Sequence, residues 1–313
     1  MAFHMGYRFS GHETFPFRYP WLPKACMGII RSPTAFSDED SAMVEFGVGK
    51  NMVRAMRFWV EAADLAVTTE GSSLNATPLG EAFFGQDGLD PYLEDIQTLW
   101  LLHWNISTQI ESPLFAWEFL LNRWQEHEIA EGPVLKAFAQ ESERLAQKKL
   151  SPVTLHQHFD VFLHTYLPTR GKKGELADDN LDCPLTELEL LTVVGDRDVG
   201  GKHREPVYAF RKEEKPSISP ELFTWALMDF WRKRWPEEKT LSAQLIAHGV
   251  GSPGQIFKLP EQDVMSRLGD LAATTRDALT FQDSTALPQV IRNREVDPMA
   301  LLKTAFYTKA IHV

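Results

Sequence analysis

The clearest periodic pattern in the chain lies in residues 50–64. Apolar residues recur there at intervals of three and four, at Val53, Met56, Trp59, Val60 and Ala63. This spacing is typical of a helix with one buried face, and no Gly or Pro interrupts it. The opposite face carries basic and amide side chains, at Lys50, Asn51, Arg54 and Arg57. We therefore predict an amphipathic helix over residues 50–64.

Shorter elements flank this helix on both sides. Residues 19–30 have Pro near their start, which favours a first helical turn. Ser37 and the three acidic residues after it are typical of a helix start, and a Gly-Val-Gly turn follows at residues 47–49. Two short runs separated by Glu-Gly-Ser predict a hairpin, and a short helix follows; they cover residues 65–69, 73–77 and 78–84. We predict a winged helix-turn-helix domain over residues 1–88.

Residues 89–168 are predicted to form a helical region. Four segments begin with a polar residue or Gly followed by Pro, which is typical of a helix start. These starts are Asp90-Pro91, Ser112-Pro113, Gly132-Pro133 and Ser151-Pro152.

Residues 169–313 are predicted to form a C-terminal α(+β) domain. Its polar segments 169–182 and 196–205 are expected to be loops, and residues 188–194 and 207–211 are expected to be strands. Two later helices and two strands repeat the rhythm of the N-terminal domain, at residues 240–248, 260–273, 278–282 and 288–292. The fold class is therefore mainly α, and the C-terminal pattern allows a second winged helix.

Composition limits the kind of nucleic-acid binding that the chain can have. The net charge is −11, which excludes attraction of DNA by the whole surface but allows a local basic patch. The two cysteines form no CxxC motif, so a reducing cytoplasm is the expected setting. No signal-peptide pattern and no long apolar run is present, so no membrane association is expected.

The amphipathic helix is the strongest candidate for binding DNA. The N-terminal residues of a recognition helix meet base edges in the major groove, and Lys, Arg and Asn are suited to bases and phosphates. We expect Lys50, Asn51, Arg54 and Arg57 to contact DNA, while Arg170, Lys172 and Lys173 follow phosphates from a loop. Two alternatives remain open: the basic face is merely solvated, or the domain binds another protein.

A second candidate site lies near the N-terminus. His12 and Glu13 are adjacent there, and Arg18 follows within the same aromatic-rich segment. His12 and Glu13 suit general acid–base catalysis, and Glu13 also suits a metal. The alternative is a structural contact that holds the N-terminal arm against the first helix.

Two further groups suggest metal binding only weakly. His156 and Asp160 share a helix face but His158 does not, whereas zinc needs three or four converging ligands. The acids at 90, 94 and 95 suit magnesium, but they also suit the first turn of a helix. We predict no metal site from these residues.

Five segments carry a resemblance to a known family. They are FSGHETFPFRY (9–19), FGVGKNMVRAMRFWVEAADL (46–65), TPLGEAFF (77–84), DPYLEDIQTLWLLHW (90–104) and GSPGQIFKL (251–259). On these segments the chain resembles a bacterial, SspB-like family of domains of unknown function. Its members occur in gene clusters for DNA phosphorothioate modification and phage defence, of the Dnd and Ssp type.

The resemblance implies a cytoplasmic DNA-binding protein that works with a cysteine desulfurase, an ATPase and a sulfotransfer enzyme. It also implies an endonuclease activity that nicks one strand for sulfur insertion. His12 and Glu13 are then the candidate catalytic residues. The cofactor stays unknown, and a divalent ion such as Mg²⁺ is expected only if the chain nicks DNA. Two alternatives remain open: a non-enzymatic adaptor that recruits the modification enzymes to DNA, and a transcriptional regulator of the defence cluster.

Overall fold

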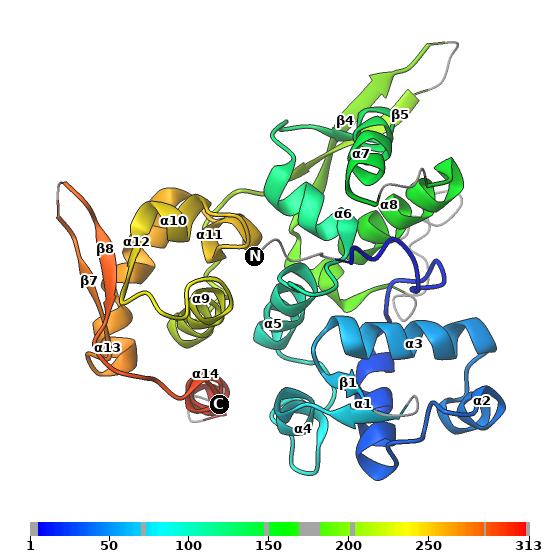
Figure 1. Ribbon diagram of the computed structural model, residues 1–313, viewed down its shortest axis with the longest axis horizontal. Coiled ribbons are helices and arrows are strands. Elements are labelled where there is room, and N and C mark those ends of the chain that lie inside the picture. The colour runs from blue at the N-terminus through cyan, green and yellow to red at the C-terminus, as the bar shows by residue number, and fades with distance from the viewer. Residues whose placement is uncertain are drawn as a thin grey trace. The chain divides into compact units, whose positions relative to one another are not determined.

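The protein is mainly helical and carries small antiparallel sheets (Figure 1). The computed structural model describes residues 6–69, 73–146, 150–168, 182–200, 204–284 and 286–310. Two compact units are formed. Unit 1 contains residues 1–120 and 124–211, and unit 2 contains residues 121–123 and 212–313. The division at residues 88 and 168 that we expected from the sequence stays a prediction.

The first part of unit 1 consists of short helices followed by a hairpin. Its elements are α1 (Trp21–Arg31), α2 (Glu39–Phe46), α3 (Lys50–Ala62), β1 (Ala66–Thr68), β2 (Leu74–Ala76) and α4 (Pro78–Phe84). The strands pair antiparallel. The N-cap of α2 is Asp38, whose carboxylate accepts from the Ser41 amide at 2.8 Å; the sequence had suggested Ser37. Gly47 ends α2 with a φ of 68°, a conformation that Gly adopts easily.

The rest of unit 1 contains longer helices and a three-stranded sheet. Its helices are α5 (Ile96–Ser107), α6 (Phe115–Glu118), α7 (Glu131–Ala146) and α8 (Pro152–Tyr166), with a 3-10 turn at Pro184–Leu188. A π-helical turn at Phe119–Arg123 follows α6 directly. The strands β3 (Ile129–Ala130), β4 (Leu191–Asp198) and β5 (Arg204–Phe210) form an antiparallel sheet in the order β3-β5-β4.

The central helices of unit 1 form its core. Helix α5 is buried from Gln97 to Ser107, and Trp59, Trp100, Trp104 and Trp117 are almost wholly inaccessible. The start of α5 differs from the expectation. Asp90 does not open this helix, because its carboxylate accepts from the amides of Glu94 and Asp95 and closes a turn before it. The N-cap is Asp95.

Unit 2 combines helices with a second small sheet. Its elements are α9 (Pro220–Arg234), β6 (Thr240–Ser242), α10 (Ala243–His248), α11 (Pro253–Ile256), α12 (Glu261–Gly269), α13 (Leu271–Thr275), β7 (Leu279–Gln282), β8 (Gln289–Arg292) and α14 (Pro298–Ala310). The strands are antiparallel in the order β6-β8-β7. Residues 240–242 were expected to be helical but form a strand, because they pair with β8 and because the Ser242 side chain caps the helix only after them.

Among the helices in the described ranges, none has the length and apolar character needed to cross a bilayer.

Candidate nucleic-acid interface

Helix α3 presents the predicted basic residues on one face. Its other face packs into the core through Val53, Met56, Trp59 and Val60, all of them buried. This burial fixes the rotation of the helix and leaves Lys50, Asn51 and Arg54 exposed and Arg57 half-buried. Because α3 begins at Lys50, these side chains lie along its first two turns.

The two leading basic residues share one acidic partner, which sequence reasoning did not identify. Glu39 lies in the first turn of α2, and its carboxylate is 2.6 Å from Lys50 Nζ and 2.6 Å from Arg54 Nε. Hydrogen bonds from Arg54 and Lys50 lower the pKa of Glu39 to about 2, so the carboxylate is ionised at neutral pH. The Glu39 side chain is 35% exposed, that of Lys50 is 52% exposed and that of Arg54 is 45% exposed, so solvent reaches all three.

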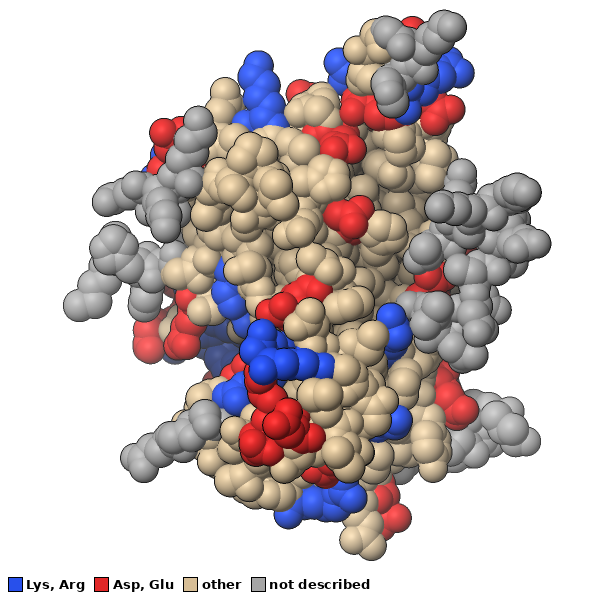
Figure 2. All heavy atoms as spheres, turned by 90° about the vertical axis from the view of Figure 1, so that its right-hand side faces the viewer, with Lys and Arg blue, Asp and Glu red and all other residues tan. Residues whose placement is uncertain are grey.

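Arg57 is held at the β1 end of the same face. Its guanidinium lies 3.4 Å from the Thr68 hydroxyl, which in turn donates to Glu61. Acidic and basic groups therefore alternate along the outer side of α3. Figure 2 shows blue and red side chains lying directly against one another over the lower part of the face it presents.

The FSGHETF segment lies against α3 and brings the two candidate sites together. The Trp59 indole N–H donates to the Phe15 carbonyl at 2.8 Å. Gly11 has a φ of 109°, and a Cβ atom there would lie 2.7 Å from the Phe58 ring. Glu13 and Thr14 also have positive φ, a conformation that costs non-Gly residues energy. This turn leaves Glu13 half-buried, and its charge helps to raise the pKa of Arg54 after the larger effect of Glu39.

His12 is paired with a histidine that lies 146 positions later in the chain. Its side chain is 3% exposed, and its Nε2 atom is 3.0 Å from Nδ1 of His158 on α8. The two rings are stacked with centroids 5.3 Å apart. The outer ring nitrogens lie near backbone amides, Nδ1 of His12 3.2 Å from Thr14 N and Nε2 of His158 3.0 Å from Ala116 N. Because each neutral ring carries one N–H, a hydrogen bond between the rings allows only one of these outer nitrogens to accept.

Burial keeps both rings of this pair neutral. Desolvation lowers the pKa of His12 to about 4. The pKa of His158 also lies well below its usual value, first through desolvation and then through the charge of His12. This contact joins the N-terminal arm to α8, whereas the structural alternative expected a contact with the first helix. Arg18 lies over the Trp21 ring of that first helix, 5.4 Å from the ring centroid. The catalytic role of His12 and Glu13 stays a prediction.

The weak metal candidates are dispersed. His156 contacts Glu131 at 3.0 Å, His158 contacts His12, and Asp160 contacts His164 at 3.3 Å. Within the described ranges, no three His, Cys, Asp or Glu side chains converge as metal ligands would. Arg170, Lys172 and Lys173 lie outside the described residues.

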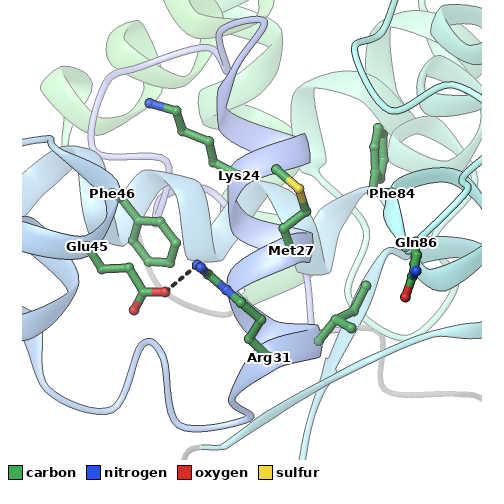
Figure 3. A pocket seen from close by; sticks show the side chains of 9 residues that line it. Lys24, Met27, Arg31, Glu45, Phe46, Phe84 and Gln86 are labelled. Carbon is green, nitrogen blue, oxygen red and sulfur yellow. Dashed lines mark hydrogen bonds and ion pairs between the residues drawn. The ribbon is translucent and has the colours of Figure 1, made fainter.

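A groove of about 480 Å³ lies on another side of unit 1, along α1 (Figure 3). Met27 and Ile30 are 45% and 40% exposed there, beside Phe46 and Phe84. The Arg31–Glu45 ion pair, 2.8 Å long, closes one side of it. Among the described candidates for DNA binding, Lys50, Asn51, Arg54 and Arg57, none lines this groove.

Residues 9–306 match the family described as "Protein of unknown function (DUF4007)". Two solved structures are similar over nearly the whole chain. One is described as "Magnesium ion-bound SspB crystal structure", with a TM-score of 0.83 and 24% identity, covering 97% of this chain and 90% of that one. The other, "SspB crystal structure", has a TM-score of 0.82 and 24% identity, covering 98% and 90%. No curated protein matches. The SspB-like resemblance found in the sequence is thereby confirmed, and the fold is shared.

Proposed function

We propose that this chain, which belongs to the DUF4007 family, binds DNA through the outer face of α3. In this proposal α1, α2 and α3 form a helix-turn-helix, and the β1–β2 hairpin is its wing. The close packing of α1 and α2 on α3 and the antiparallel pairing of the hairpin support it. The observation that carries the proposal is the position of Lys50, Asn51 and Arg54 on the exposed first turns of α3, where recognition helices contact DNA.

Unit 2 also fits a winged helix, but we propose that it does not bind DNA in the same way. The element order α9, β6, α10, α11, α12, α13, β7, β8 and the sheet order β6-β8-β7 support that fold. Helix α12, which precedes the β7–β8 strands, has Glu261 and Asp263 in its first turn, and acidic side chains there repel phosphates. Arg267 is committed inside the unit, to Asp263 and to the carbonyls of Lys215 and Ile218.

The wider role that we propose is that of the DNA-binding component of a phosphorothioate-modification and phage-defence system. The SspB-like fold supports it. The partners are then a cysteine desulfurase, an ATPase and a sulfotransfer enzyme, all acting in the bacterial cytoplasm. Recruitment of these enzymes to DNA is the simplest version, because it needs a DNA-binding face and a protein-binding surface but no catalytic residues.

A binding assay tests the DNA contact. Fluorescence anisotropy with labelled duplex and single-stranded DNA should show at least severalfold weaker binding for a Lys50→Ala/Arg54→Ala double variant. The matched control is Lys24→Ala/Arg31→Ala, which removes the same charge from the groove side of α1. The control should bind DNA as the parent does. Equal binding by all three proteins would contradict the proposal.

Strand nicking is a second candidate, favoured by the magnesium ion in the description of one similar structure. Among the described residues, no three His, Cys, Asp or Glu side chains converge, and the carboxylate of Glu39 is already paired with two cations. Relaxation of supercoiled plasmid in buffers with and without Mg²⁺ tests nicking. If His12 and Glu13 carry it, Glu13→Gln should abolish it in a protein that still binds DNA.

The regulator alternative predicts a different behaviour. A transcriptional regulator should be a symmetric dimer that binds a palindrome, with half-sites about one helical turn apart. Sedimentation of the DNA complex distinguishes this alternative from an adaptor, which needs no such symmetry.

A further inference from the structure

The basic face of α3 is neutralised by acidic residues of the same chain. Lys50 and Arg54, the two cations nearest the start of the helix, both end on the carboxylate of Glu39, each at 2.6 Å. We propose that Glu39 competes with DNA phosphates for Lys50 and Arg54, and so lowers the affinity of this face for DNA. This inference rests on the proposed function and adds the residue that regulates it.

The position of Glu39 makes it a direct competitor. A phosphate that approaches Lys50 and Arg54 competes with the carboxylate for their positive charge, since both cations already donate to it. The ammonium and guanidinium groups are about half exposed, so DNA can reach them without unfolding any element. The exchange is therefore one of ion pairs at the surface.

The start of α2 strengthens the effect. In many helix-turn-helix proteins the helix before the recognition helix crosses the DNA backbone, and a helix N-terminus attracts phosphates. Here that helix is α2. Its N-terminus carries Asp38, Glu39 and Asp40, and the Asp38 carboxylate already accepts from the Ser41 amide. These acids stabilise the N-terminus of α2 when no DNA is bound, and their negative charge repels a phosphate at the same place.

Glu13 and Glu61 add negative charge near the same face but are weaker competitors. Glu13 acts on Arg54 through its charge, and Glu61 accepts from Thr68 beside Arg57. Glu39 differs from both because it contacts two of the predicted DNA-binding side chains. It is therefore the residue whose removal should have the largest effect.

A different role for Glu39 predicts the opposite sign. If the carboxylate positions Lys50 and Arg54 for DNA, its loss should weaken binding, because two long side chains would become free to move. If it competes with phosphates, its loss should strengthen binding. The sign of the change in affinity separates the two roles.

The experiment measures duplex DNA binding by Glu39→Gln at several salt concentrations. The matched control is Glu45→Gln. It removes the same charge from α2, but the Glu45 side chain pairs with Arg31 on the groove side and not with α3. Glu39→Gln should bind DNA about two- to fivefold more tightly than the parent, the range expected when an exposed ion pair is released. The slope of log K against log salt should become steeper by up to about one, for one additional phosphate contact.

Both variants lose one negative charge, so the general effect of charge on affinity is the same for both. Glu45→Gln should change the affinity much less, because Glu45 pairs with Arg31 and not with Lys50 or Arg54. Binding by Glu39→Gln that is equal to or weaker than binding by Glu45→Gln would overturn the inference. The Lys50→Ala/Arg54→Ala double variant in the same assay separates this failure from that of the proposed function. If the double variant binds as the parent does, the α3 face is not the DNA site at all.

Discussion

The buried pair of His12 and His158 should make the stability of unit 1 depend on pH. The pKa of His12 falls from 6.5 to about 4 through desolvation, and that of His158 is lowered for the same main reason. The unfolded chain takes up protons near pH 6.5 that the folded pair does not accept. The stability contributed by neutral His12 is therefore fully present above pH 6.5 and is lost as the pH falls toward 4.

The size of the loss follows from the shift of His12. A pKa that moves from 6.5 to about 4 costs about 2 kcal/mol between pH 7 and pH 5, and about 3 kcal/mol by pH 4. His158 adds a loss in the same direction. A typical domain is stable by only about 5–15 kcal/mol, so the change is large enough to measure.

The assay is equilibrium unfolding by urea at pH 7, 6 and 5, followed by tryptophan fluorescence. His12→Gln keeps a hydrogen-bonding side chain at the site but removes the titrating ring. Between pH 7 and pH 5 the parent should lose about 2 kcal/mol more than this variant. His156→Gln removes an exposed histidine from α8, the helix that carries His158, and should lose as much stability as the parent. An equal slope for the parent and His12→Gln would refute the reasoning.

Three further predictions concern stability. Gly11→Ala should reduce the free energy of unfolding by about 1–3 kcal/mol and lower the Tm, because φ is 109° and the new Cβ would meet the Phe58 ring. Gly6→Ala is the control and should not lower the Tm, because no atom lies near the new Cβ there. Tyr166→Phe should cost about 1–3 kcal/mol by urea unfolding, since its hydroxyl pairs with His103 and Trp117 in the core. Burial lowers the pKa of Lys258 to about 7, so the stability of the parent should fall between pH 10 and pH 7. Lys258→Met should lack that slope when thermal unfolding is compared at pH 9.5 and pH 7.

The elements with strong local signals could be predicted from the sequence. Helix α3 was expected at residues 50–64 and lies at Lys50–Ala62. Two local signals indicated it: the helical spacing of its apolar residues and the Gly-containing turn just before Lys50. The β1–β2 hairpin was expected within one or two residues of its position. Ser151-Pro152 marked the start of α8 correctly, since Ser caps and Pro fits the first turn. Ser112-Pro113 did not mark a start, because α6 begins at Phe115 and its N-cap is Leu114.

The candidate site could be predicted only in part, because its key contacts join distant residues. Glu39 and Arg54 are 15 positions apart and His12 and His158 are 146 apart, so no local spacing reveals either pair. The three acids at the start of α2 were interpreted as favourable to the helix end, which they are, but one of them also binds α3. Strand β6 was missed because a strand of three residues is defined by its partner β8 and not by its own pattern.

The contact between α3 and DNA is the central claim, and photo-crosslinking tests it most directly. A photo-crosslinking amino acid placed at position 51, in place of the exposed Asn51, should form a covalent adduct with labelled duplex DNA on irradiation. The same amino acid at position 24, in place of Lys24 on the groove side of α1, should form little or none. Adducts from position 24 but not from position 51 would contradict the account, because DNA would then bind a different face of unit 1.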